Sequence, residues 1–168
     1  MADEGYSRWM RLLALAAAAA GVAAAGALPA VAQEGPPPTA AASPARAGAA
    51  PIALTLKLHY EMVCGRPGPG PLVVTLPHAL RVPVAIARSA VQLQGKEPAS
   101  VSVAGHVVTI GVPVSTGISC FSITMGTLTT TFRPAARLGA PAEAGSYPVL
   151  ARIGKHAFTA RLAIGSKG

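Results

Sequence analysis

Apolar and polar residues alternate along the segment that begins at Ile52, and this period of two is the feature that most limits the fold. One face carries Ile52, Leu54, Leu56, Leu58, Tyr60 and Met62, and the other carries Thr55, Lys57, His59 and Glu61. Successive side chains of a β-strand point to opposite faces, so the pattern predicts a half-buried strand. Cys64 continues the apolar face, and a Gly/Pro-rich loop follows it at residues 65–71.

Shorter segments of the same kind recur along the rest of the chain, and glycine or proline separates them. We expect strands at 72–76 and 91–94, and a hairpin over 99–113 with its turn at 104–106. Two further strands are expected at 117–125 and 127–132, separated at Gly126, and a final hairpin over 146–164 around Gly154-Lys155. Residues 77–90 read as an irregular crossing with one helical turn. No amphipathic helix of useful length is predicted. About eight short strands with polar turns predict an all-β chain, folded as an antiparallel β-sandwich.

The N-terminus has the pattern of a secretory signal peptide. Arg8 and Arg11 precede an alanine-rich apolar region from Leu12, and residues 30–32 read Ala-Val-Ala, a small-x-small cleavage site. We therefore expect residues 1–32 to be removed, although an uncleaved membrane anchor is the alternative. Residues 33–51 are rich in Pro and Ala and are expected to be a flexible or partly extended linker. The domain is then expected to span residues 52–168, without a stable membrane span after cleavage.

Two cysteines, Cys64 and Cys120, are the only ones in the chain. An even count in an exported chain predicts one disulfide. This bond would enclose about 57 residues and stabilise the fold by roughly 4 kcal/mol. It would also fix the base of the loop at 65–71, which has few apolar side chains to anchor it. The alternative is a redox or nucleophilic cysteine, but neither a nearby histidine nor a Cys-x-x-Cys spacing supports it.

The residue types needed for catalysis or metal binding are scarce. Asp3 is the only aspartate and there is no asparagine, so a Ser-His-Asp triad lacks its acid. The carboxylates of the expected domain are Glu61, Glu97 and Glu143, which lie in separate segments. His59 and Glu61 share one strand face, but no third ligand is close in sequence; His78, His106 and His156 are isolated. We expect no catalytic residues, no metal site and no cofactor.

The chain is strongly basic, with 14 Lys and Arg against 6 Asp and Glu and a formal net charge of +8. Five of the cations come from neighbouring late segments and could form one patch: Arg133, Arg137, Arg152, Lys155 and Arg161. Such a patch would contact anionic wall polymers, acidic polysaccharide or phospholipid head groups. The alternative is a basic surface that only maintains solubility. Nucleic-acid binding is not expected, because the chain has no row of aromatic residues for base stacking.

One region resembles a known family. The segments "SAVQLQG", "SVSVAGHVVTIGVPV" and "GTLTTTF" with "AARLGAPAEAGSY" are similar to the Ig-like β-sandwich modules of secreted and surface proteins of Gram-positive bacteria. The likeness covers about residues 90–153 and, loosely, the whole domain. Gln94 and Ala140 stand where the family usually has asparagine, and the two cysteines are additions. The resemblance implies an Ig-like sandwich with a spacer, adhesive or wall-associated role, and it carries no catalytic residues.

Together these observations predict a secreted, non-catalytic structural or binding module at the cell envelope. Its partner would be an anionic wall polymer or another envelope protein, and loops 65–71 and 134–145 would form any recognition surface. Two alternatives remain open at this point. One is a small secreted enzyme, redox protein or metal-binding protein that uses Cys64, Cys120 or the histidines. The other is a secreted inhibitor that presents the Gly/Pro loop to a protease.

Overall fold

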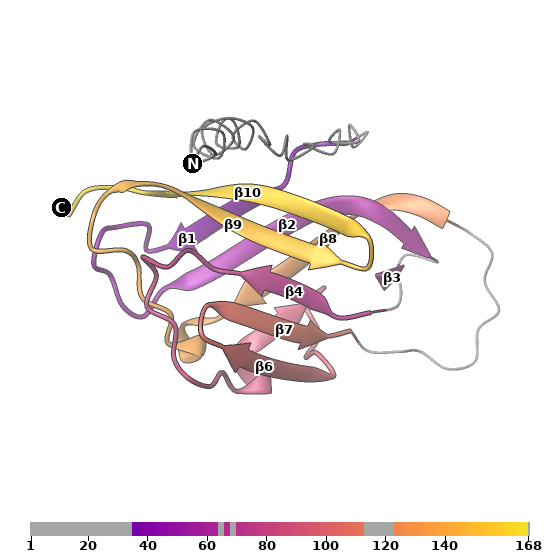
Figure 1. Cartoon of the computed structure of the whole chain (residues 1–168), viewed down its shortest axis with the longest axis horizontal. Helices are drawn as coiled ribbons and strands as arrows, with labels where there is room; N and C mark the ends of the chain where they lie inside the picture. Colours follow the sequence, from indigo (N-terminus) through magenta and orange to yellow (C-terminus); the bar gives the residue numbers. More distant parts are fainter. Residues whose placement is uncertain (1–34, 64–65, 68–69, 113–122, 168) are drawn as a thin grey trace, which may run out of the picture. The chain divides into compact units, whose positions relative to one another are not determined.

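The computed structural model describes residues 35–63, 66–67, 70–112 and 123–167 (Figure 1). The chain divides into two units, Met1–Ala32 and Gln33–Gly168, and all the described residues belong to the second. The elements are β1 (Thr39–Ser43), β2 (Ala53–Val63), β3 (Arg66–Pro67), β4 (Leu72–Thr75), the 3-10 turn η1 (Arg88–Ala90), β5 (Val91–Leu93), β6 (Ser100–Ala104), β7 (Val107–Gly111), β8 (Ile123–Phe132), the 3-10 turn η2 (Pro134–Ala136), β9 (Gly145–Ile153) and β10 (His156–Ile164). The predicted all-β class is confirmed. Among the described residues, no helix has the length and apolar character needed to cross a membrane.

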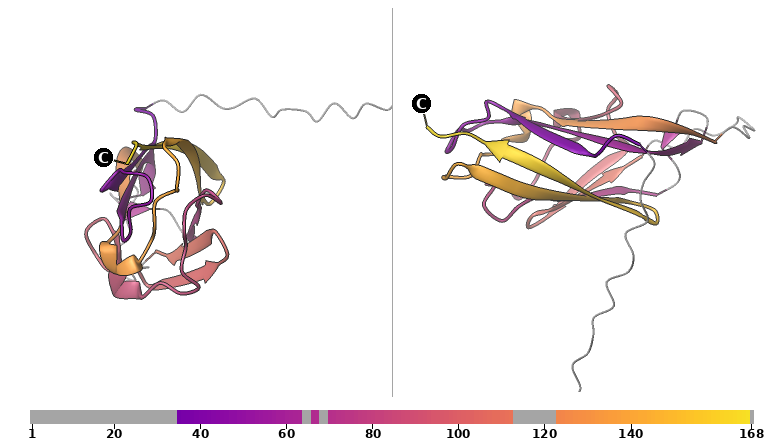
Figure 2. Two further views of the ribbon diagram at one scale, coloured as in Figure 1. Left: turned by 90° about the vertical axis from the view of Figure 1, so that its left-hand side faces the viewer. Right: turned by 90° about the horizontal axis from the view of Figure 1, so that it is seen from above.

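The strands form one mixed sheet rather than two separate ones. Its order is β5-β8-β2-β1-β10-β9-β4-β7-β6, and β3 pairs with β2 off this path. Neighbours are antiparallel except β1 and β10, which are parallel. The sheet curls until it is nearly closed, so the strands surround one core (Figure 2). Along this path, β1 alone joins the group β5-β8-β2 to the group from β10 to β6.

The alternating face of β2 is buried in the core, as its period of two predicts. Leu54, Leu56 and Leu58 have no exposed surface, and Tyr60 and Met62 are each 3% exposed. Each fully buried leucine contributes about 2 kcal/mol from loss of apolar surface to water. β2 pairs with β8 from Leu54↔Phe132 to Val63↔Ile123, and this is the longest strand pair of the sheet.

The prediction of two strands separated at Gly126 is wrong, because β8 runs unbroken from Ile123 to Phe132. Gly126 pairs with Tyr60 inside the β2–β8 ladder and does not have a positive φ. A Cβ atom at this position would lie 2.7 Å from Sδ of Met62. The glycine therefore makes room for a core side chain of the neighbouring strand and does not end its own strand.

The flexible linker predicted over residues 33–51 is also wrong for the part that the structure describes. Thr39–Ser43 forms β1, in which Ala40 and Ala42 face the core and the other three residues are exposed. Farther along, Ala47 is buried and its N–H donates to the carbonyl of Gly165 at 2.9 Å. Alanine has little apolar surface, but small side chains fit where β1 fills the space between β2 and β10, and its backbone bonds with both neighbours.

Glycine sets the two tight hairpins, as predicted. In β6–β7 the two loop residues are Gly105 and His106, and in β9–β10 they are Gly154 and Lys155. Both glycines have positive φ, 59° and 54°, at the first central position, which is the requirement of a type II′ turn. The hairpin turn therefore fixes the register of β9 against β10, and this register positions the basic residues described below.

Candidate functional site

The β9–β10 hairpin carries three of the five cations predicted to form a patch. Arg152 lies on β9, Arg161 on β10 and Lys155 in the turn between them, and all three side chains are exposed. Arg152 pairs with Ala157, and Arg161 pairs with Pro148. Positions 148 and 152 lie on the same face of β9, about 13 Å apart at the rise of a β-strand. The hairpin therefore presents Arg152 and Arg161 on its outer face and Lys155 at its tip.

The other two predicted members lie at the opposite end of the sheet. Arg133 follows the last residue of β8, and Arg137 follows η2 with a φ of 57°. This end is the one where Phe132 pairs with Leu54 and where β10 finishes at Ile164. The length of β10 separates this end of the sheet from the β9–β10 turn by about 26 Å. Figure 1 shows η2 and the turn on opposite sides. The five cations do not form one patch.

The three cations of the hairpin have no carboxylate beside them on the outer face. Among the described residues the carboxylates are Glu61 on β2, Glu97 after β5 and Glu143 before β9. The only ion pair found in this part of the chain is between Arg88 and Glu97. The carboxylates of the described residues therefore do not neutralise the positive charge of the hairpin.

One exposed apolar side chain lies between the two arginines of the outer face. Leu150 is 47% exposed and pairs with Thr159 of β10, midway between the Arg152 and Arg161 positions. Large exposed aliphatic side chains are rare in this domain; the others among the described residues are Val84 and Met125. The hairpin face, which we define as Arg152, Lys155, Arg161 and Leu150, thus combines three unpaired cations with one apolar contact.

The loop predicted as a recognition surface at 134–145 is largely part of the fold. Leu138 is fully buried and Ala140 is 2% exposed. The backbone of the loop bonds to the supposed linker, where the Ala140 N–H donates to the Ala49 carbonyl at 2.8 Å, and to the residue that follows the linker, where the Ile52 N–H donates to the Leu138 carbonyl at 2.8 Å. Residues 136 and 138–141 are buried, whereas residues 134, 135, 137 and 142–145 are exposed. The middle of this loop is therefore not available to a partner.

The predicted loop at 65–71 is described only in part, and Cys64 and Cys120 lie outside the described residues. The disulfide stays a prediction. The described strands nevertheless bear on it, because Val63 pairs with Ile123 at the end of the β2–β8 ladder. Cys64 follows Val63 directly and Cys120 precedes Ile123 by three residues. The two segments that lead to the cysteines thus start from adjacent positions.

The histidines do not gather into a metal site in the described part of the chain, where no group of three or more potential ligands occurs. Nδ1 of His59 lies 3.4 Å from Oγ1 of Thr127, and His156 contacts the rings of Tyr60 and Phe158. His78 and His106 pack edge to face, with ring centroids 4.7 Å apart. These contacts match ordinary packing of aromatic rings.

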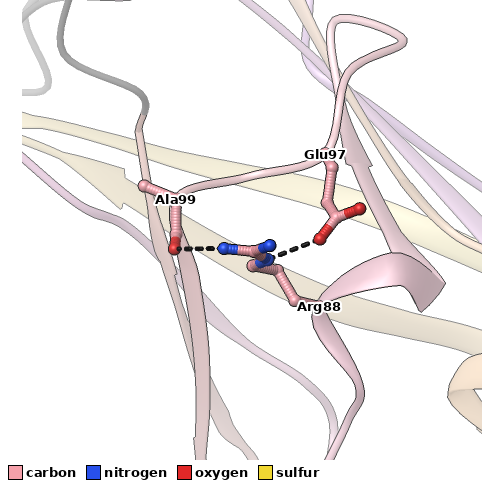
Figure 3. Close-up of polar contacts among 3 residues, drawn as sticks. All are labelled: Arg88, Glu97 and Ala99. Carbon is pink, nitrogen blue, oxygen red and sulfur yellow. Dashed lines mark hydrogen bonds and ion pairs between the residues drawn. The ribbon is translucent and has the colours of Figure 1, made fainter.

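Arg88, Glu97 and Ala99 form a polar contact that the sequence did not reveal (Figure 3). Nε of Arg88 donates to Oε1 of Glu97, and Nη1 donates to the carbonyl of Ala99 at 3.4 Å. The two charged side chains are 58% and 46% exposed, so the pair is screened by water and contributes less than about 1 kcal/mol. It ties η1 to the segment before β6 and is a structural contact.

Comparison with known proteins adds no family to this description. No protein-family model matches the chain, and no curated protein matches it.

Proposed function

We propose that the chain is a secreted, non-catalytic binding module of the cell envelope that contacts anionic wall polymers through its β9–β10 hairpin. The observation that carries this proposal is the hairpin face, where Arg152, Lys155 and Arg161 have no ion pair with a carboxylate of the described residues. Polymers with regularly spaced phosphates or carboxylates suit such a face, because their charges can meet several cations at once. Leu150 between the arginines adds an apolar contact for the carbon backbone of a polymer.

We further propose that the fold is an Ig-like sandwich whose two layers are the strand groups on either side of β1. β1 pairs with β2 antiparallel and with β10 parallel, as a first strand does when it passes from one layer to the other. Tyr147, near the start of β9, donates its hydroxyl to the carbonyl of Glu143 four residues upstream at 2.9 Å. A tyrosine in this position, bonded back to the preceding corner, is a hallmark of Ig-like sandwiches. Tyr147 also belongs to the segment that carries the family resemblance.

Export is supported by the sequence alone. The positive flank, the alanine-rich apolar region and the Ala-Val-Ala site resemble a cleaved signal peptide. Cys64 and Cys120 would then meet an oxidising compartment and form a disulfide. The intact mass of the exported protein, alkylated with and without reductant, tests both points. A chain that starts at Gln33 and takes up label only after reduction supports them, whereas label without reductant contradicts the disulfide.

Wall binding is tested by co-sedimentation of the purified domain with cell walls. The triple variant Arg152→Gln, Lys155→Gln, Arg161→Gln removes the hairpin cations. If each exposed cation contributes about 0.5 kcal/mol, the variant binds about tenfold more weakly. Added salt should also reduce binding of the native protein, since exposed charges are screened.

The matched control removes three other exposed cations, by Lys57→Gln, Arg133→Gln and Arg137→Gln. It carries the same net charge as the hairpin variant. We expect it to sediment nearly as well as the native protein, because these residues lie on β2 and at the far end of the sheet. Equal losses in the two variants would show that only net charge matters, and the hairpin proposal would then be abandoned.

A further inference from the structure

The strand β6 lies at one end of the sheet, and its own residues lack the charge and the proline that often protect a strand edge. It pairs with β7 on one side only. Its sequence, Ser-Val-Ser-Val-Ala, has no charge and no proline, and its pairing with β7 is regular over all five residues. The other edge strand, β5, is three residues long and ends in a tight turn. Exposed edges normally carry charges, prolines or bulges that prevent pairing with another chain.

The residues of β6 are self-complementary around Ser102. If a second β6 paired antiparallel about a two-fold axis at Ser102, Val101 would face Val103 of the partner and Ser100 would face Ala104. Paired residues project to the same side of a sheet. The half-buried valines would therefore meet valines on one side, and small polar or alanine side chains would meet on the other.

The charge distribution favours contact of a second copy with β6 rather than with other parts of the surface. The chain has a net charge of +8, so two copies repel each other over most orientations. Residues 98–112, which hold both strands of the β6–β7 hairpin, contain no Lys, Arg or Glu, and His106 is their only titratable residue. Two copies that meet through β6 bring uncharged segments together; the nearby cation Arg88, which bonds to the Ala99 carbonyl, is paired with Glu97.

We propose that β6 pairs with β6 of a second copy, which makes a symmetric dimer with one sheet continued across the two-fold axis. A two-fold interface uses the same surface on both copies, as the self-complementary sequence requires. A five-residue edge is small, so the dimer lies at the weak end of specific interfaces. This inference does not depend on the proposed wall contact, which uses a different hairpin.

Analytical ultracentrifugation from about 10 µM to about 1 mM tests the association. We expect a monomer–dimer equilibrium that strengthens between about 0.05 M and about 0.5 M salt, because salt screens the repulsion between the two basic copies. Ser102→Lys places two ammonium groups opposite each other at the axis and should weaken association at least about tenfold. Ser102 is exposed, so the variant should keep the native melting temperature.

Thr159→Lys on β10 is the matched control, since it adds the same charge at another exposed strand position. It should dimerise like the native protein. A protein that stays monomeric at every concentration and salt, or equal losses with the two lysines, would overturn the proposal.

A covalent test fixes the register. Directly opposed residues of antiparallel strands have Cα atoms about 4.5–5.5 Å apart, within the range of a disulfide. Under mild oxidation, Ser102→Cys should therefore form a cross-link that joins position 102 of one copy to position 102 of the other, identified by peptide mass mapping. Thr159→Cys, equally exposed, should cross-link far more slowly. Similar yields for the two variants, or links from position 102 only to Cys64 or Cys120, would refute the two-fold pairing.

Discussion

Ala42→Glu tests whether the Pro/Ala-rich segment is a strand of the domain or a linker to it. Ala42 pairs with Leu54 of β2 and packs against the core, whereas Ala41 pairs with Thr55 and is exposed. Because side chains alternate along a strand, the same substitution at the two neighbouring positions must have different effects. In a linker the two substitutions would be equivalent. The pair Ala42→Glu and Ala41→Glu therefore needs no other control.

The expected magnitude follows from where the carboxylate is placed. At position 42 a glutamate must bury part of its charge against the core or push β1 away from β2 and β10, and we expect a loss of about 2–4 kcal/mol in the free energy of unfolding. For a domain of this size, that loss corresponds to a melting temperature lower by roughly 10 °C. At position 41 the carboxylate points into water, so the change should stay within about 0.5 kcal/mol.

Urea denaturation of the two variants and the native protein is the assay. A shift of the midpoint for Ala42→Glu without a change in the slope identifies a loss of stability rather than a change in the unfolding reaction. Equal midpoints for both variants would show that β1 is not part of the cooperative fold. A larger loss for Ala41→Glu would instead show that the register of β1 is displaced by one residue.

Three further comparisons examine single features of β8 and its neighbours, all by urea denaturation. Thr130→Val replaces a fully buried hydroxyl that has no hydrogen-bond partner in the described part of the chain. It should raise the free energy of unfolding by about 1 kcal/mol. Thr131→Val, on the outer face, should not raise the free energy of unfolding. Gln94→Ala should lower the free energy of unfolding more than Gln94→Gly does. Both variants lose the hydrogen bonds from the side chain to the β8 backbone, but only glycine adopts the positive φ of 53° without strain. Gly126→Ala should lower the free energy of unfolding by about 1–2 kcal/mol in the native protein and by much less in the Met62→Ala variant. An equal loss in the Met62→Ala variant would refute the explanation that Gly126 makes room for Met62.

The parts of the fold that the sequence could predict are those set by neighbours along the chain. The alternation around Leu56 defines β2, and Gly105 and Gly154 define two hairpins, since each signal lies within a few residues of the structure it produces. The contact of Gln94 was not predicted, because Nε2 of its side chain reaches the carbonyl of Thr127 on β8, a distant strand, at 2.8 Å.

The errors concern contacts between distant segments. β1 lies between β2 and β10, and its parallel partner in β10, Leu162 opposite Ala40, is more than a hundred residues away in the chain. The role of Gly126 depends on Met62 of another strand, which no local pattern could reveal. The five cations are close in sequence, yet β9 and β10 are long enough to separate Arg133 and Arg137 from the turn. Closeness along an extended chain therefore does not predict a patch; the strand register decides it.

Salt should affect the two proposed surfaces in opposite directions, and this allows them to be tested in one protein. Contact between the hairpin cations and an anionic polymer weakens as counterions screen it, whereas pairing of two copies through the uncharged β6 strengthens because the repulsion between basic molecules is screened. Ser102→Lys should abolish the second effect while leaving wall binding intact, and the triple glutamine variant of the hairpin should do the reverse. If wall binding and dimerisation both rose or both fell with salt, one surface would serve both contacts. The assignment of wall binding and dimerisation to separate hairpins would then be wrong. Wall co-sedimentation and ultracentrifugation of the same samples over one salt series provide the measurement.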